Sequence, residues 1–166
     1  IIIPTHNSEL GIRESIDSII NQTLNFEENI EIIIADNNSE DKTKDICSDY
    51  ISKYSNIQYI QLDTVNFSRA KNEAIKKAQG KFIAFLEPHD FFSKDSLLNL
   101  LKFINDHEDI DLALLPIFYY KNGRKEQYLN YKIQNSKKID LIENPQYSQL
   151  LGLSTFFRNR SSAEIE

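Results

Sequence analysis

Short apolar runs alternate with amphipathic segments over the first 115 residues, and this alternation restricts the fold more than any other feature. The apolar runs cover residues 1–3, 30–35, 57–62, 81–86 and 111–115. Three successive isoleucines within residues 30–35 are typical of a strand buried on both faces, as in a parallel sheet. The segments between the runs repeat apolar residues at helical spacing. The pattern predicts an α/β domain with a mostly parallel central sheet flanked by helices.

Charge and cysteine content narrow the class of protein. The 166-residue chain has a formal net charge of −6, which argues against a nucleic-acid partner because such partners need a basic face. Its one thiol, Cys47, gives no disulfide framework and is expected to be a buried apolar residue. No apolar run approaches the ~20 residues of a transmembrane segment. The chain starts at Ile1 and contains no methionine, so we expect it to be an excerpt of a longer protein.

Polar residues follow four of the five predicted strands, at the point where each strand ends. These clusters are residues 4–7, 36–39, 63–66 and 87–90. The carboxyl ends of parallel strands lie along one edge of a sheet, and ligands of open α/β sheets bind there. We therefore expect the four clusters to converge on one crevice.

The side chains of these clusters suit a nucleotide that is held through a metal ion. Asp36 can accept an N–H from a base, and Asn7, Asn38 and Ser39 can bond a base or a ribose. The cluster at 87–90 supplies carboxylate and imidazole ligands, and Mg²⁺ or Mn²⁺ usually combines one or two protein groups with diphosphate oxygens. Each cluster alone has a structural alternative, namely a turn, a helix cap or a surface loop.

After Pro116 the alternation stops. Residues 118–131 place Asn122 and Gly123 between two aromatic-rich runs, which predicts a β-hairpin because both turn positions tolerate positive φ. The aromatic side chains have an alternative role as the lining of an acceptor groove.

Three segments carry a resemblance to a known family. IIIPTHN, EIIIADNNSEDKT and FSRAKNEAIKKAQGKFIAFLEPHDFF resemble glycosyltransferase family 2, whose members typically carry IIPTYN, VDDGSTD, ARN and FLDSDD in this order. The resemblance covers Ile1 to about Leu101. It implies the GT-A fold, a Rossmann-like fold of nucleotide-diphospho-sugar transferases. It also implies that residues 1–116 form the donor-binding half and that residues 117–166 begin a truncated acceptor-side half.

The resemblance also implies a donor site. The nucleotide-binding residues predicted from it, together with the strand-end clusters, are Pro4, Thr5, His6, Asn7, Asp36, Asn38, Lys71 and Glu87. The metal site, for Mn²⁺ or Mg²⁺, is predicted at Glu87, His89 and Asp90. The chain departs from the family at three places: Asn37 replaces a second Asp, Lys71 replaces the commoner Arg, and Glu87-Pro88-His89 replaces Asp-x-Asp.

The implied activity is that of an inverting transferase that moves a sugar from a UDP-sugar to an acceptor hydroxyl. The acceptor would be a saccharide, a polyol phosphate or a lipid-linked group in cell-surface polysaccharide, teichoic acid or glycolipid synthesis. The reaction is expected on the cytoplasmic side, including the inner face of the membrane. The general base, an acidic residue in this family, is expected beyond Glu166.

Two alternatives remain. One is a degenerate, non-catalytic GT-A module, which the Glu87-Pro88-His89 string and the missing base favour. The other is a nucleotidyltransferase, which would usually carry a glycine-rich phosphate loop after the first strand. The segment after the first strand, PTHNSEL, contains no glycine, so a nucleotidyltransferase is the less favoured alternative.

Overall fold

A three-stranded parallel sheet forms the centre of the structure, a computed structural model that describes residues 1–63, 65–107, 112–114, 118–121, 124–127 and 155–157. Its strands are β1 (Ile2–Thr5), β2 (Ile32–Asp36) and β3 (Ile57–Gln61), in the order β1-β2-β3. The segment that contains β4 (Ile83–Ala84) continues the parallel arrangement next to β1. A parallel bridge joins Ile2 to Phe85, and the Leu86 amide donates to the Ile2 carbonyl at 3.0 Å.

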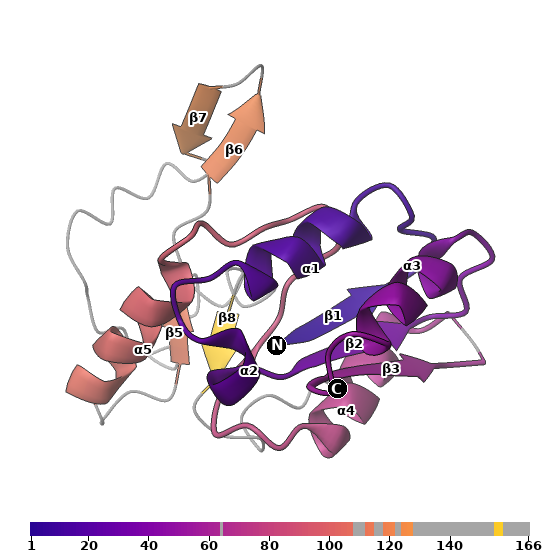
Figure 1. The fold of residues 1–166 in the computed structure, drawn as a ribbon, viewed down its shortest axis with the longest axis horizontal. Coiled ribbons are helices and arrows are strands. Elements are labelled where there is room, and N and C mark those ends of the chain that lie inside the picture. Colours follow the sequence, from indigo (N-terminus) through magenta and orange to yellow (C-terminus); the bar gives the residue numbers. More distant parts are fainter. Residues whose placement is uncertain (64, 108–111, 115–117, 122–123, 128–154, 158–166) are drawn as a thin grey trace, which may run out of the picture.

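Helices connect the strands, as the alternation predicts (Figure 1). They are α1 (Ile12–Ile20), α2 (Phe26–Asn29), α3 (Thr43–Ile51), α4 (Phe67–Lys77) and α5 (Ser96–Asp106). The four longer helices confirm the predicted ones, with ends that differ by a few residues. The sequence pattern missed α2 because a single turn is too short to show a helical period.

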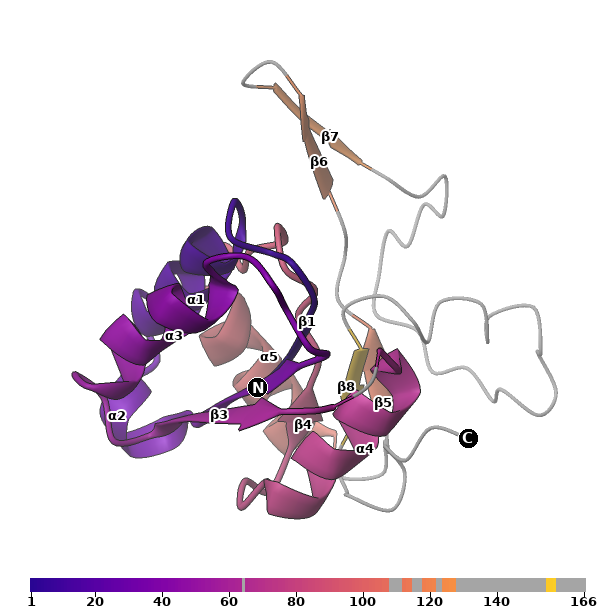
Figure 2. The same ribbon diagram turned by 90° about the vertical axis from the view of Figure 1, so that its right-hand side faces the viewer.

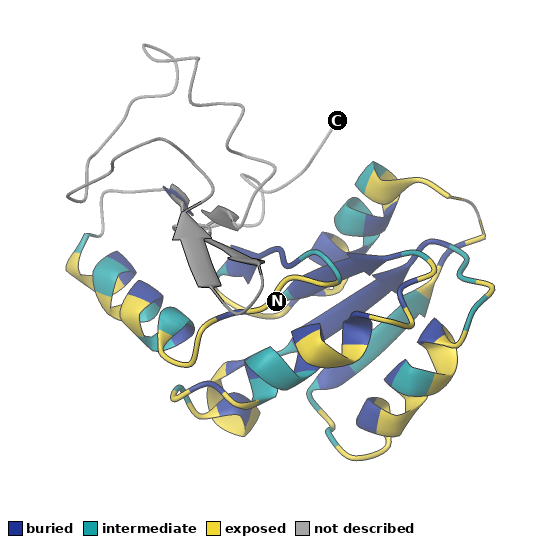
Figure 3. Ribbon diagram, turned by 90° about the horizontal axis from the view of Figure 1, so that it is seen from above, coloured by how far each residue is buried: buried dark blue, intermediate teal, exposed yellow. Residues whose placement is uncertain are grey.

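The sheet is covered on both faces, with α1 and α3 on one side and α4 on the other (Figure 2). Ile32 and Ile34 pack with α1 and α3, whereas Ile33 and Ala35 pack with α4. All four residues are buried, and the exposed residues of the helices lie on the sides turned away from the sheet (Figure 3). The prediction of a strand buried on both faces is confirmed.

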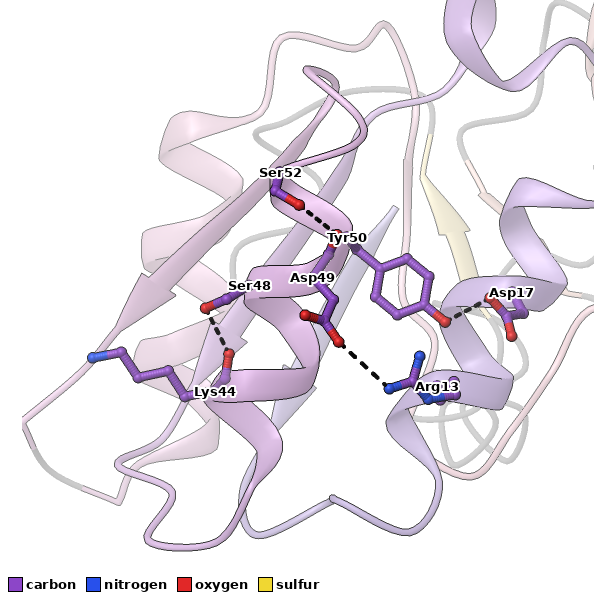
Figure 4. A network of polar contacts seen from close by, with 7 residues as sticks. All are labelled: Arg13, Asp17, Lys44, Ser48, Asp49, Tyr50 and Ser52. Carbon is purple, nitrogen blue, oxygen red and sulfur yellow. Dashed lines mark hydrogen bonds and ion pairs between the residues drawn. The ribbon is translucent and has the colours of Figure 1, made fainter.

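Polar contacts join α1 to α3 above the apolar core (Figure 4). The Tyr50 hydroxyl donates to Oδ1 of Asp17 at 2.6 Å, and Arg13 lies 3.8 Å from Asp49. The Arg13 guanidinium also lies over the Tyr50 ring, 5.6 Å from its centroid. Burial, followed by the bond to Asp17, raises the pKa of Tyr50 to about 12. These contacts hold α1 against α3, and α1 follows the loop that leaves β1.

A second sheet corrects part of the predicted topology. Its order is β4-β8-β5, in which β8 (Thr155–Phe157) lies antiparallel to both β4 and β5 (Leu112–Leu114). Because β4 and β5 both lie antiparallel to β8, they run in the same direction, so the fifth strand keeps its predicted direction but pairs with β8 and not with β4. Local periodicity cannot reveal β8, because its partners lie more than forty residues earlier in the chain.

The predicted hairpin is confirmed. Strands β6 (Phe118–Lys121) and β7 (Arg124–Gln127) pair antiparallel, with Lys121 opposite Arg124, and project from the body of the fold (Figures 1 and 2). Its turn residues lie outside the described residues, and the acceptor-groove alternative stays a prediction. Among the helices that the structure describes, none is long and apolar enough to cross a membrane.

Candidate functional site

The polar clusters after the strands of the parallel sheet meet at its carboxyl edge, as predicted. Thr5 pairs with Asp36 across β1 and β2, and the Asn37 amide donates to the Thr5 carbonyl at 2.8 Å. The N-cap of α4, Asn66, donates its backbone N–H to Oδ1 of Asn37 at 3.1 Å. Residues that follow β1, β2 and β3 are thus bonded to one another at one edge of the sheet.

Side chains hold the loops after β1 and β2 against each other. The Asn7 amide donates to Oγ of Ser39 at 2.9 Å, and Oδ1 of Asn7 accepts from the Glu40 amide at 2.8 Å. The Ser8 amide donates to Oγ1 of Thr43 at 2.8 Å. Asn7 has a φ of 48°, a left-handed conformation that Asn tolerates better than most residues. These reciprocal bonds give the first wall of the site a fixed shape.

The imidazole of His6 belongs to the same wall. Its Nδ1 lies 2.8 Å from the Asn37 carbonyl, which only accepts, so Nδ1 carries the proton. Its Nε2 then accepts from the Asn7 side-chain amide at 3.2 Å. The predicted contact between His6 and a nucleotide stays a prediction, since both ring nitrogens already have partners in the protein.

Asp36 is fully buried, and both of its carboxylate oxygens accept hydrogen bonds from the protein. The backbone N–H and the hydroxyl of Ser39 donate to Oδ1 at 3.0 and 2.6 Å. The Tyr59 hydroxyl donates to Oδ2, and burial together with this bond raises the pKa of Tyr59 far above its usual value. The carboxylate of Asp36 therefore holds the side chains of Ser39 and Tyr59 in place. Its direct contact with a base stays untested.

Two buried polar atoms at the edge have no hydrogen-bond partner within the described part of the chain. They are Oγ1 of Thr5 and Nδ2 of Asn37, and both residues are 0% exposed. An unsatisfied buried donor or acceptor costs about 1–3 kcal/mol, so such atoms are rare unless a ligand completes them. The two side chains lie on neighbouring strand ends, and the Asn66 backbone N–H bonds the other side-chain atom of Asn37, Oδ1.

Pro4 and Asn38 complete the predicted nucleotide residues. Pro4 is buried in β1 opposite Ala35. Asn38 is half-buried and has a φ of 61°, which turns the chain after β2. Both lie at the carboxyl edge, and their contacts with a nucleotide stay predictions.

Lys71 and Glu87 form an ion pair across the site. Nζ of Lys71, on the second turn of α4, lies 3.0 Å from Oε1 of Glu87, which follows β4. The Lys71 side chain is 16% exposed and Glu87 is 41% exposed. The ammonium also lies 5.3 Å from the centroid of the Phe85 ring. The sequence predicted both residues for the site, but not that they pair with each other.

The residues predicted as metal ligands each have contacts within the protein. His89 has a φ of 79°, and a Cβ placed on Gly11 would lie 2.0 Å from Nδ1 of His89. The imidazole therefore packs on the residue that precedes α1. Asp90 donates its N–H to the Glu87 carbonyl at 3.0 Å, and its own carbonyl accepts from Oγ of Ser15 at 2.8 Å. Partial burial and then the charge of Glu87 raise the pKa of the Asp90 carboxyl, while His89 opposes the shift.

The arrangement of Glu87, His89 and Asp90 bears on whether they could hold a divalent cation. Among the described residues, no group of three His, Cys, Asp or Glu side chains is placed to hold a metal ion. The carboxylate of Glu87 is already compensated by Lys71, and His89 lies against α1. The donor set present here does not fit the predicted three-ligand site.

An open pocket of about 790 Å³ lies elsewhere, along the outer side of α1. None of the predicted site residues lines it. Its lining residues are Leu10, Arg13, Glu14, Asp17, Ser18, Asn21, Phe91, Phe92 and Lys94. Because it involves no strand-end cluster, we do not assign the site to it.

Comparison with known proteins identifies relatives of the whole chain. The family model "Glycosyl transferase family 2" matches residues 1–163. The chain is 37% identical over 167 aligned residues to the minor teichoic acid biosynthesis protein GgaB of Bacillus subtilis, covering 99% of the chain and 18% of that protein. It is 34% identical to the poly(ribitol-phosphate) beta-N-acetylglucosaminyltransferase TarS of Staphylococcus aureus, over 70% of the chain and 20% of TarS. The chain thus spans about a fifth of the length of these relatives.

Solved structures agree with the fold. A crystal structure of S. aureus TarS superposes with a TM-score of 0.80 and 28% identity, covering 95% of this chain and 45% of that one. TarS has also been solved in complex with UDP-GlcNAc, with a TM-score of 0.79 and 27% identity over 95% of this chain and 44% of that one. A mannosyltransferase from Pyrobaculum calidifontis, in complex with GDP-Man and Mn2+, shares the fold at a TM-score of 0.63 and 20% identity, over 70% of this chain and 34% of that one.

Proposed function

Because the chain belongs to glycosyl transferase family 2, we propose that it forms the donor-binding part of an inverting glycosyltransferase that uses a UDP-sugar. The acceptor hydroxyl would belong to a cell-surface polymer such as teichoic acid. The names of GgaB and TarS, and the UDP-GlcNAc complex of TarS, support this choice of donor and polymer.

The observation that carries the proposal is the meeting of four strand-end clusters at one edge. Thr5, Asn37 and Asn66 are connected there by hydrogen bonds, and Lys71 reaches across to Glu87. The site therefore combines buried polar atoms that lack partners with an ammonium group at its rim. This is a suitable environment for a polar base at one end and an anionic diphosphate at the other.

The amino end of α4 adds to the positive potential. Asn66 caps this helix, because its side-chain Oδ1 accepts a hydrogen bond from the Arg69 backbone N–H at 2.9 Å. The first turn of a helix carries a partial positive charge, which favours a phosphate group nearby. Lys71 lies one turn further along the same helix, so both sources of positive potential face the carboxyl edge of the sheet.

In the proposed reaction an acceptor oxygen attacks the anomeric carbon of the donor sugar. The bond between that carbon and the diphosphate oxygen breaks, and UDP leaves with the electron pair. The acceptor proton passes to a general base, which we expect beyond Glu166. Negative charge grows on the diphosphate as the bond breaks, and fixed positive groups stabilise that transition state. We propose Lys71 for this task, which its ion pair with Glu87 at the rim of the site supports.

The predicted Mn²⁺ or Mg²⁺ at Glu87, His89 and Asp90 stays a prediction, and no step of the reaction is routed through it. The family fold holds Mn2+ in the P. calidifontis mannosyltransferase. The predicted cytoplasmic location and the two-part division at residue 116 also stay predictions.

Nucleotide binding tests the proposal at the level of this chain. Titration calorimetry would compare UDP, CDP, GDP and ADP, each with and without MnCl₂. We expect UDP to bind and the purine nucleotides to bind at least roughly tenfold more weakly, equal to about 1.4 kcal/mol. A folded chain that binds none of the four would contradict the proposal and favour the non-catalytic module.

A further inference from the structure

The ion pair between Lys71 and Glu87 already occupies the place where the family resemblance puts a metal ion. Nζ of Lys71 lies 3.0 Å from Oε1 of Glu87. A divalent cation bound to the same carboxylate would either displace the ammonium or lie within a few ångströms of it. Two like charges at that separation repel each other. Lys71 and a metal ion would therefore compete for the charge of this carboxylate.

The position of the ammonium is set by more than one partner. The ring of Phe85, which is buried, lies 5.3 Å below it, within the range of a cation–π interaction. Glu87 accepts a hydrogen bond from one of the three ammonium N–H groups. No further acceptor for Lys71 occurs among the residues that the structure describes, and its side chain is 16% exposed. The remaining N–H groups are thus able to donate to an anion that enters from solvent.

The other two candidate metal ligands are held by contacts elsewhere. His89 has a left-handed backbone and its ring packs against Gly11, so that a Cβ on Gly11 would lie 2.0 Å from Nδ1. The Ser15 hydroxyl fixes the backbone of Asp90 to α1 at 2.8 Å. Both contacts hold the turn at 87–90 against the start of α1.

Resting on the donor-binding function proposed above, we propose that the ammonium of Lys71 takes the place of a divalent cation beside the donor's diphosphate. Glu87 is then a positioning residue that holds Lys71 in the site before the donor binds. The diphosphate accepts the free N–H groups of Lys71 and draws the ammonium partly away from Glu87. Donor binding in this chain does not depend on Mn²⁺ or Mg²⁺.

Substitutions at the two partners separate this arrangement from a metal site. Glu87→Gln keeps an oxygen that accepts from Lys71 but removes the negative charge. If Lys71 acts as the cation, this variant binds UDP in EDTA as well as the parent chain or more tightly. If a metal ion is needed, the same variant loses a ligand and loses UDP. Lys71→Met removes the charge at similar length, and Lys71→Arg restores it.

The experiment is a calorimetric titration of the full chain with UDP in EDTA and in MnCl₂. We expect the parent chain to have the same Kd in both buffers within roughly threefold, which is less than 1 kcal/mol. Lys71→Met should weaken UDP at least roughly tenfold, the loss of one charge-assisted hydrogen bond, and Lys71→Arg should recover most of it. Lys76→Met is the matched control, because Lys76 also lies on α4, 3.0 Å from a glutamate, but is 63% exposed.

Uridine distinguishes a role at the diphosphate from a general loss of structure. It lacks phosphate, so its affinity should be the same for the parent chain and for Lys71→Met, and thermal unfolding should show both variants folded. UDP binding that requires Mn²⁺ and is abolished by Glu87→Gln would overturn the inference and leave the donor-binding function intact. A folded parent chain that binds no UDP in either buffer would overturn both.

Discussion

Gly11 and His89 lie so close together that a Cβ on Gly11 would be 2.0 Å from Nδ1 and 2.5 Å from Cγ of the imidazole. The contact joins the start of α1 to the turn after β4. His89 reaches it with a φ of 79°, a conformation that non-glycine residues seldom adopt.

Gly11→Ala should therefore destabilise the chain by about 1–3 kcal/mol, the usual cost of overpacking. His89→Ala in the same chain should remove most of that cost, because the added methyl group then has room. Urea unfolding of the two single variants and the double variant gives the coupling energy, which we expect to reach at least about 0.5 kcal/mol. Strictly additive effects would show that the two residues do not touch.

Thr5 and Thr43 are both 0% exposed but differ in their hydroxyl groups. Oγ1 of Thr43 accepts from the Ser8 amide at 2.8 Å, whereas Oγ1 of Thr5 has no partner among the described residues. Thr5→Val should thus leave the free chain equally stable or up to about 1 kcal/mol more stable, because it removes an unsatisfied polar atom. Thr43→Val should cost about 1–2 kcal/mol. Chemical denaturation measures both.

The Thr5→Val variant also tests whether the Thr5 hydroxyl binds the donor. If the Thr5 hydroxyl is reserved for the donor, Thr5→Val weakens UDP binding while it does not lower stability. Unchanged UDP affinity would show that the orphaned hydroxyl has no part in the site.

Tyr59→Phe removes the hydrogen bond to the buried carboxylate of Asp36. A hydrogen bond to a charged group contributes about 1.5–3 kcal/mol, and we expect a loss of this size in the free energy of unfolding. Tyr54→Phe is the control, because that hydroxyl has no hydrogen-bond partner within the described ranges while its ring packs against Phe26. Equal effects of the two substitutions would refute a special role for the pair.

Cys47 should be inert in the folded chain. Burial, followed by the charges of Asp36 and Asp41, raises its pKa from 9.0 to about 12. A higher pKa leaves less thiolate at any given pH, here roughly a thousandfold less at pH 8. A thiol-specific disulfide reagent should react slowly with the native chain and at once in urea. Rapid labelling of the native chain would contradict the burial of this residue.

The order of strands and helices could be predicted because its cause is local. Three isoleucines in β2 alternate between the two faces of the sheet, and Ile12, Ile16 and Ile19 repeat at helical spacing in α1. The meeting of the strand-end clusters followed from parallel topology alone. The burial of Cys47 followed from its helical surroundings.

The parts that escaped prediction depend on contacts distant in sequence. Tyr59 reaches Asp36 only because of the register between β2 and β3, where Ile34 lies opposite Tyr59. The direction of His89 depends on a left-handed backbone and on the missing side chain of Gly11. Motif spacing placed His89 beside Glu87, but it could not show which way the imidazole points.

The most direct test of the central claim is to map UDP on the isotope-labelled chain by amide chemical-shift changes. The account predicts saturable changes at the carboxyl edge of the sheet, in residues 5–7, 36–39, 66–71 and 87–90, and none along α5 (Ser96–Asp106). Saturable changes confined to the pocket beside α1, or no changes in a folded chain, would contradict it.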